Sequence, residues 1–90
     1  MRVALICTDH PGALQTRLDN RAAHLAHIEA SGVVEMAGPF LDDAGAMCGS
    51  LIVLEVPDLA AARAWAEADP YARAGLFARV ELREWKKVIG

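Results

Sequence analysis

The side chains of this 90-residue sequence best suited to proton transfer or nucleophilic attack are three histidines, two cysteines and one tyrosine. His24 falls in a segment of helical periodicity, beside Leu25 and on the same helix face as Arg21 and Ile28. We expect its imidazole to be half-buried, and an imidazole accepts or donates protons near neutral pH. Asp69 stands where a later helix must end, and its carboxylate could fix the tautomer of that ring. This pair predicts acid–base chemistry without a nucleophile.

Each of these residues also has a structural explanation. A His24–Asp69 hydrogen bond could simply hold two helices together, and an aspartate before a proline commonly caps the following turn. Tyr71 is suited to packing as well as to orienting a substrate oxygen. Ser50 lacks the Gly-x-Ser-x-Gly context of an activated nucleophile, so we expect a hydrogen-bonding role at most. The residues alone favour the structural role of the His24–Asp69 pair over the catalytic one.

The other histidines and the cysteines form no recognisable motif. His10 falls in a turn and His27 on the outer part of the helix, so both are expected to be solvated. The spacing of His24 and His27 is too weak a signal for a metal site. Cys7 and Cys48 have no CxxC spacing and are expected to be small buried hydrophobes. With no glycine-rich loop after a strand either, we expect neither metal nor cofactor.

The elements that must position these residues alternate between strand and helix patterns. Apolar runs rich in β-branched residues predict strands, and apolar residues three and four apart predict helices. In the first helix the apolar stripe is expected to be Leu14, Leu18, Ala22, Leu25 and Ile28, and in the second helix the inward face is expected to be Leu59, Ala62, Trp65 and Ala66. The predicted elements are a strand over 2–8, a helix over 13–30 closed by Gly32, strands over 33–37 and 50–56 separated by a loop over 41–49, a helix over 59–68 capped by Asp58, one further turn over 70–75, and a strand over 77–88.

The predicted order is β-α-β-β-α-β, which indicates an α+β fold of the ferredoxin-like two-layer sandwich type in one domain, 1–90. Right-handed crossovers place the first and third strands in the centre of the sheet. Both strands are apolar on both faces, whereas helices can cover only one face. We therefore expect a homodimer in which the open sheet face meets a second copy.

Composition excludes several classes of protein. Apolar residues make up 54% of the chain, more than a lone domain of this size usually needs, which agrees with a dimer. The net charge is −3 and no basic run occurs, so we expect no nucleic-acid partner. The longest apolar runs are far too short to span a bilayer, and no signal-peptide pattern occurs. We therefore expect a cytoplasmic protein that does not associate with membranes.

Several short segments together resemble the YciI-like (YCII-related) proteins, although each alone is a weak motif. The resemblance extends over essentially the whole chain, in the same order and spacing. The matching segments are Arg21-Ala22-Ala23-His24-Leu25, Ala37-Gly38-Pro39-Phe40, Gly49-Ser50, Ala68-Asp69-Pro70-Tyr71 through Gly75, and Lys86-Lys87-Val88.

The resemblance implies a ferredoxin-like dimer of the dimeric α/β-barrel type, with a His and Asp site in a cleft. The matching positions are His24 and Asp69 as catalytic residues. One relative is a dehydrochlorinase acting on a chlorinated hydroxyquinol, and the barrel also resembles muconolactone isomerases. The loop from Asp42 to Met47 is shorter than in many relatives, so any specificity carried by that loop need not transfer. The substrate-lining residues implied are Arg21, Gly38, Pro39, Ser50 and Tyr71.

Two hypotheses of different classes follow. In the first, the chain is a cofactor-independent enzyme of the lyase, isomerase or dehydrochlorinase type that acts on a small ring compound. His24 would move the proton, Asp69 would orient the ring, and Arg21 could hold an anionic group. In the second, it is a dimeric small-ligand-binding or protein-interaction module whose His–Asp pair is structural, since the family includes members linked to sigma-factor-like regulators. An enclosed space with His24 at its wall would favour the enzyme.

Overall fold

The computed structural model describes residues 1–90 and alternates strands with helices. Strands form where β-branched residues alternate or run together, and helices form where alanine and leucine dominate. The elements are β1 (Arg2–Asp9), α1 (Leu14–Ser31), β2 (Val34–Leu41), β3 (Met47–Glu55), α2 (Leu59–Ala68), the single turn α3 (Pro70–Arg73) and β4 (Phe77–Glu84).

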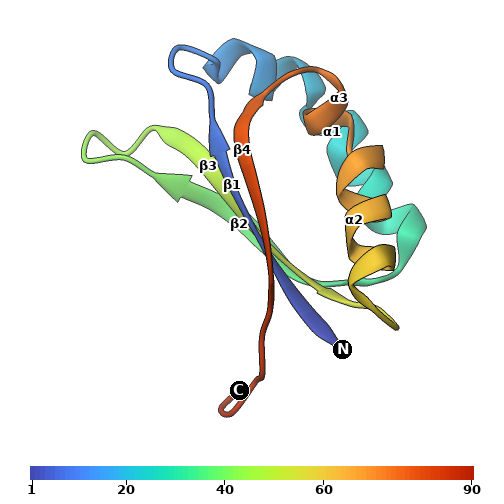
Figure 1. Ribbon diagram of the computed structural model, residues 1–90. Coiled ribbons are helices and arrows are strands. Elements are labelled where there is room, and N and C mark those ends of the chain that lie inside the picture. The colour runs from blue at the N-terminus through green and yellow to red at the C-terminus, as the bar shows by residue number, and fades with distance from the viewer.

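All four strands belong to one antiparallel sheet in the order β2-β3-β1-β4. The helices cover one face of this sheet and leave the other face open (Figure 1). The first and third strands occupy the centre, as right-handed crossovers require. The predicted α+β, ferredoxin-like βαββαβ sandwich is therefore confirmed.

Local signals begin and end the helices close to the predicted positions. Gly32 follows α1 with φ +66°, a left-handed conformation that glycine adopts without steric cost. Asp58 caps α2 by accepting a hydrogen bond of 2.8 Å from the backbone N–H of Ala61. Pro70 separates α2 from α3, because the residue before a proline is held in an extended conformation.

The core lies between the sheet and the helices. Alternate residues of the central strands point toward the helices, where Val3 lies opposite Leu54 and Leu5 lies opposite Ile52. These four side chains are at most 1% exposed. Trp65 of α2 covers them from the helix layer. The centre of the sheet is thus a rigid platform for the residues at its ends.

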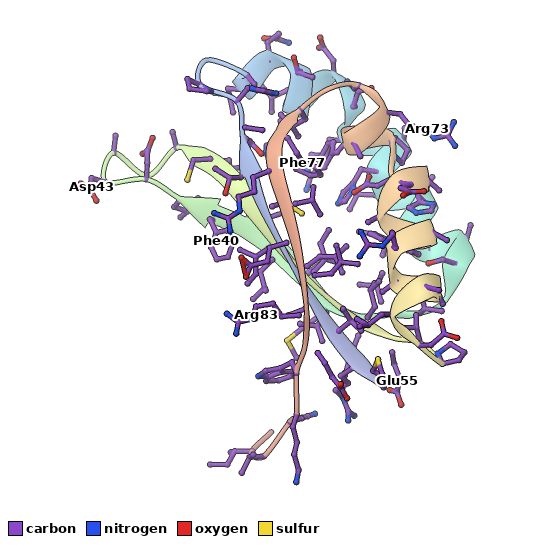
Figure 2. The ribbon with its side chains drawn as sticks, viewed as in Figure 1. Phe40, Asp43, Glu55, Arg73, Phe77 and Arg83 are labelled. Atoms are coloured by element: carbon purple, nitrogen blue, oxygen red, sulfur yellow. The ribbon has the colours of Figure 1, made fainter.

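The open face of the sheet also carries apolar side chains. Ile6 lies opposite Leu51 on this face, and both are half-buried. Met36 and Phe40 of the edge strand are 45% and 40% exposed. Figure 2 shows Phe40 and Arg83 on the side of the sheet away from the helices. An apolar centre bordered by charge is typical of an interaction surface.

The prediction for β2 is wrong at its end. The expected strand stops at Ala37, whereas β2 continues through Pro39 to Leu41, and β3 begins at Met47 rather than Ser50. Because β2 is an edge strand, a proline that lacks an N–H removes no donor that the sheet needs. The segment between Leu41 and Met47 is therefore a hairpin turn shorter than the predicted loop, and β2 pairs with β3 over more residues than expected.

The expected inward stripe of α1 is also wrong in part. Leu14, Leu18 and Leu25 are 43%, 47% and 44% exposed, whereas Arg17 and His24 are buried. Leu18 follows Arg17 and Leu25 follows His24 by one residue, which is about 100° around a helix. The helix is thus rotated so that polar residues face the sheet, because aspartates from elsewhere in the chain bind them.

Two smaller predictions at the periphery are wrong as well. The last strand ends at Glu84 and not at Val88, because its partner β1 begins at Arg2, whose carbonyl accepts a hydrogen bond from the N–H of Trp85, while the carbonyl of Met1 bonds instead to Val56. Leu59, the first residue of α2, is 44% exposed rather than inward. Neither difference alters the surroundings of His24.

Candidate active site between α1 and the sheet

His24 lies on the inward side of α1 and is 6% exposed, so it is more deeply buried than expected. Its Nδ1 lies 2.7 Å from Oδ1 of Asp69, which forms the predicted pair across 45 residues of sequence. Asp69 accepts the hydrogen bond in the tautomer that carries its proton on Nδ1. That tautomer leaves Nε2 with a lone pair that can take a proton.

Asp69 occupies the junction of α2 and α3 and is 1% exposed. Its backbone is extended, with φ −61° and ψ 124°, as its position before Pro70 demands. The same Oδ1 atom accepts a second hydrogen bond, of 3.0 Å, from the backbone N–H of Tyr71. The expected capping role and the contact with His24 therefore coexist, and the cap holds the carboxylate in place for the imidazole.

Tyr71 stacks on the imidazole of His24, with ring centroids 3.9 Å apart and planes 13° apart. Phe77 meets the other side of this cluster edge-on, at 6.0 Å between centroids. Burial raises the pKa of Tyr71 above its usual value, although the charges of Arg17 and Arg21 lower it in part. The phenol is therefore a protonated hydroxyl at neutral pH and can donate a hydrogen bond.

A buried ion pair that the sequence analysis missed adjoins this stack. Arg17 donates from Nε to Asp9 at 2.9 Å and from Nη2 at 2.8 Å, and Nη2 also donates to Ser50 Oγ at 3.0 Å. Burial lowers the pKa of Arg17, but the hydrogen bond and charge of Asp9 outweigh it, so the net shift is upward. The guanidinium carbon lies 4.9 Å from the centroid of the Tyr71 ring.

The signal for Arg17 was present in the spacing of α1. Arg17, Arg21 and His24 are four and three residues apart, so they share a helix face with Ile28. Arg21, His24 and Ile28 were assigned to that face, but Arg17 was not, because the neighbouring leucines form a more obvious apolar stripe. Asp9 gave no comparable signal, because it ends a strand just before a turn, where aspartate is common.

A cleft of about 180 Å³ opens where α1 faces the outer part of the sheet. It brings together six of the seven predicted site residues, while Asp69 lies behind His24 rather than on the wall. Apolar atoms contribute most of the rest of the lining. The lining residues are Arg17, Arg21, His24, Leu25, Ala37, Gly38, Pro39, Met47, Ser50, Ile52 and Tyr71.

The remaining candidates lie apart from this wall. Cys7 is 1% exposed, and burial, with a smaller contribution from Asp69, raises the pKa of its thiol to about 12. This thiol is neutral and unsuited to nucleophilic attack. His27, expected in solvent, is half-buried instead, because its Nε2 lies 3.2 Å from the carbonyl of Trp65 and the two rings pack together. His10 is exposed in its turn.

The structure contains no group of three or more His, Cys, Asp or Glu side chains arranged to hold a metal ion. No helix is both long and apolar enough to cross a membrane. The polar groups that face the cleft are thus two guanidiniums, an imidazole and two hydroxyls. Such a set suits a small ligand with oxygen atoms along its edge.

Comparison with known protein families shows which family has this arrangement. Residues 1–86 match the model of the YCII-related domain. The chain belongs to the YCII-related family. It is 37% identical over 98 aligned positions to protein YciI of Escherichia coli O6:H1, covering 99% of this chain and all of that protein. It is 34% identical, with the same coverage, to an uncharacterized protein of Haemophilus influenzae. The expected family is therefore confirmed.

Solved structures give the same result for the fold. The YCII-related chain superposes with a TM-score of 0.86 on 5-chloro-2-hydroxyhydroquinone dehydrochlorinase (TftG) of Burkholderia phenoliruptrix AC1100 in complex with 2,5-dihydroxybenzoquinone. The two are 36% identical over 96% of this chain and 94% of that one. An antibiotic biosynthesis monooxygenase, 16% identical over 96% and 98% of the two chains, has a TM-score of 0.54 and shares the fold alone.

Proposed function

We propose that this chain is a cofactor-independent acid–base enzyme acting on a small hydroxylated ring, with His24 as the catalytic base. The observation that carries the proposal is the 2.7 Å His24–Asp69 hydrogen bond at the wall of an open cleft. A pair that only joined two helices would not need one of its members at a cleft wall. The similarity to the dehydrochlorinase supports a small-molecule enzyme of this kind.

The chemistry follows from how the ring nitrogens are used. Asp69 accepts the hydrogen bond from Nδ1–H, so Nε2 is free to take a proton from an acidic hydroxyl of the ligand. The electron pair left on that oxygen moves into the ring, and a ring carbon takes the proton back from the imidazolium of His24. Where that carbon bears a leaving group, loss of a second hydroxyl proton to His24 then expels the group as an anion; where it bears none, the return of the proton has moved a double bond. The resulting imidazolium lies beside the buried carboxylate of Asp69, which stabilises its charge.

The other lining groups position the ligand. The protonated hydroxyl of Tyr71 donates to a ring oxygen, and the exposed guanidinium of Arg21 attracts the anion that forms. Gly38 of the edge strand has no side chain and Pro39 has only a compact ring, so a flat ligand can approach the backbone of β2. These assignments give His24, Tyr71 and Arg21 complementary tasks in one proton transfer.

The working unit in this proposal is a homodimer formed through the open sheet face. Met36 and Phe40 lie exposed on that face beside the half-buried Ile6 and Leu51. Packing this face against the same face of a second copy would remove these side chains from water. It would leave the cleft uncovered, because the cleft lies on the helix side of the sheet.

The first experiment measures chloride release from 5-chloro-2-hydroxyhydroquinone, the compound in the name of the similar dehydrochlorinase. Replacing His24 by Gln should keep the fold and lower turnover by about 10²–10⁴-fold, the usual contribution of a general base. Binding of 2,5-dihydroxybenzoquinone, followed by NMR shifts of residues on the wall, tests the cleft separately.

His27→Gln is the matched control, because His27 lies on the same helix and is half-buried but does not line the cleft. It should keep wild-type turnover. A folded His24→Gln protein with wild-type activity would rule out the catalytic base. Binding without turnover in the wild type would instead favour a ligand-binding module with a structural His–Asp pair.

A further inference from the structure

Two arginines line the cleft, one of them in a buried ion pair and the other without an ionic partner. Arg17 is 3% exposed, and its Nε and Nη2 bind both oxygens of Asp9. Both side chains of this pair are nearly inaccessible, at 4% and 5% exposure. A bidentate pair of this kind is geometrically fixed and electrically neutral, so Arg17 offers shape and residual N–H groups but no net charge.

Arg21, one helical turn further along α1, has no such partner. It forms no ion pair in the structure, is exposed to solvent, and still lines the cleft. The remaining charged group near the wall is Asp69 behind His24. Once a ligand proton moves to His24, the imidazolium cancels Asp69, and Arg21 is the one uncompensated cation of the cleft.

We propose that Asp9 is a specificity-determining residue of this site, because it neutralises Arg17 and so leaves Arg21 alone to meet the charge of the ligand. The inference rests on the proposed function and extends it to substrate class. The site takes a weakly acidic ring that is bound as a monoanion, in preference to a dianion. A second negative charge would find the charge of Arg17 already satisfied by Asp9.

Asp9 acts through Arg17 and does not line the cleft, which makes it a clean position for a test. Asp9→Asn keeps the size and one acceptor oxygen but restores a full positive charge to the wall. We expect affinity for a dianion to rise by about tenfold, as for one added charge at a partly solvated site, with affinity for a neutral ring unchanged. This gain should shrink with added salt.

The probes are phenol, 4-hydroxybenzoate and 4-hydroxyphthalate, which carry no, one and two carboxylates on the same ring. Binding to the full chain is measured by calorimetry or NMR titration at neutral pH. The wild type should prefer 4-hydroxybenzoate, and Asp9→Asn should shift that preference toward 4-hydroxyphthalate. Arg21→Gln should weaken both anions and leave phenol unchanged.

A double variant separates charge from stability. Asp9→Asn with Arg17→Gln removes both charges at once, so it should return the order of affinities to that of the wild type even if the single variant is poorly folded. Asp19→Asn removes one carboxylate charge from the exposed side of α1, where Asp19 bonds to Gln15 and not to Arg17, so it should keep the wild-type order.

The proposal fails if Asp9→Asn changes the affinity for all three probes by the same factor. It also fails if the wild type binds phenol as tightly as 4-hydroxybenzoate, or binds neither. Because every readout is binding, absence of turnover would overturn the acid–base proposal and leave this result standing. Normal turnover of the wild type, together with an unchanged charge preference in Asp9→Asn, would overturn the role of Asp9 and leave the acid–base proposal standing.

Discussion

Replacement of Asp69 by Ala should destabilise the protein far more than the loss of an ordinary helix cap. Asp69 Oδ1 accepts hydrogen bonds from the backbone N–H of Tyr71 and from His24 Nδ1, and the side chain is almost completely buried. Loss of an N-cap costs about 1 kcal/mol. Leaving the imidazole N–H buried without an acceptor costs about 1–3 kcal/mol more, so the free energy of unfolding should fall by about 2–4 kcal/mol.

Asp58 provides a matched control on the neighbouring helix. It caps α2 through one hydrogen bond of 2.8 Å but is exposed and contacts no histidine. Asp58→Ala should therefore cost only the capping contribution of about 1 kcal/mol. The difference between the two alanine variants isolates the His24–Asp69 interaction. Asp69→Asn keeps an acceptor for both donors and should fall between them, while activity drops with the lost charge.

Urea unfolding is a suitable assay, because the buried Trp65 should change its fluorescence when the core opens. Each variant needs the same slope against urea as the wild type for the comparison to hold. Equal destabilisation by Asp69→Ala and Asp58→Ala would refute the reasoning, because the buried pair would then contribute nothing beyond the cap.

Three other predictions concern alkaline stability, assembly and the buried ion pair. The pKa of Cys7 is about 12 in the folded state against 9.0 for a free thiol, so the folded state keeps its proton longer and this stability is lost as pH rises above 9. Unfolding at pH 10 should need about 1.4 kcal/mol less than at pH 8 from this group, and Cys7→Val should lack that part of the slope. Sedimentation at tens of micromolar should find a dimer that Met36→Glu with Phe40→Glu converts to monomer; a wild-type monomer would contradict the open-face interface. Asp9→Leu with Arg17→Met should unfold at the same or higher urea concentration than the wild type and, like the polar double variant, keep the wild-type order of ligand affinities; a large loss of stability would show that the pair is structural.

The sequence was sufficient for the order of the elements because each signal is local. Asp58, Gly32 and Pro70 mark helix ends through interactions within a few residues, and the apolar central strands differ plainly from the edge strand β4. The continuation of β2 through Pro39 depends on β2 being an edge strand, which is a property of the assembled sheet. A local pattern cannot contain that information.

The candidate site was predictable to a different extent. The family resemblance gave His24 and Asp69, and the cleft contains the other positions that it implied. The spacing in α1 contains both an apolar stripe and a polar face, and it could not decide between them, because Arg17 and His24 turn inward only when Asp9 and Asp69 are there to receive them. The hydrogen bond to Asp69 spans 45 residues, so its effect on the helix appears only in the folded chain.

The rotation of α1 is itself an argument for function. A chain of 90 residues has a small core, and ionic groups in its interior cost desolvation free energy that apolar side chains would avoid. Leu18 and Leu25 follow Arg17 and His24 by one position, so the helix already carries apolar residues that a rotation of about 100° would bury. The fold instead places an arginine and a histidine inward, each held by its own aspartate, and both open onto one cleft. Stability alone does not favour that choice, whereas a site that must hold a proton acceptor beside a fixed guanidinium requires it.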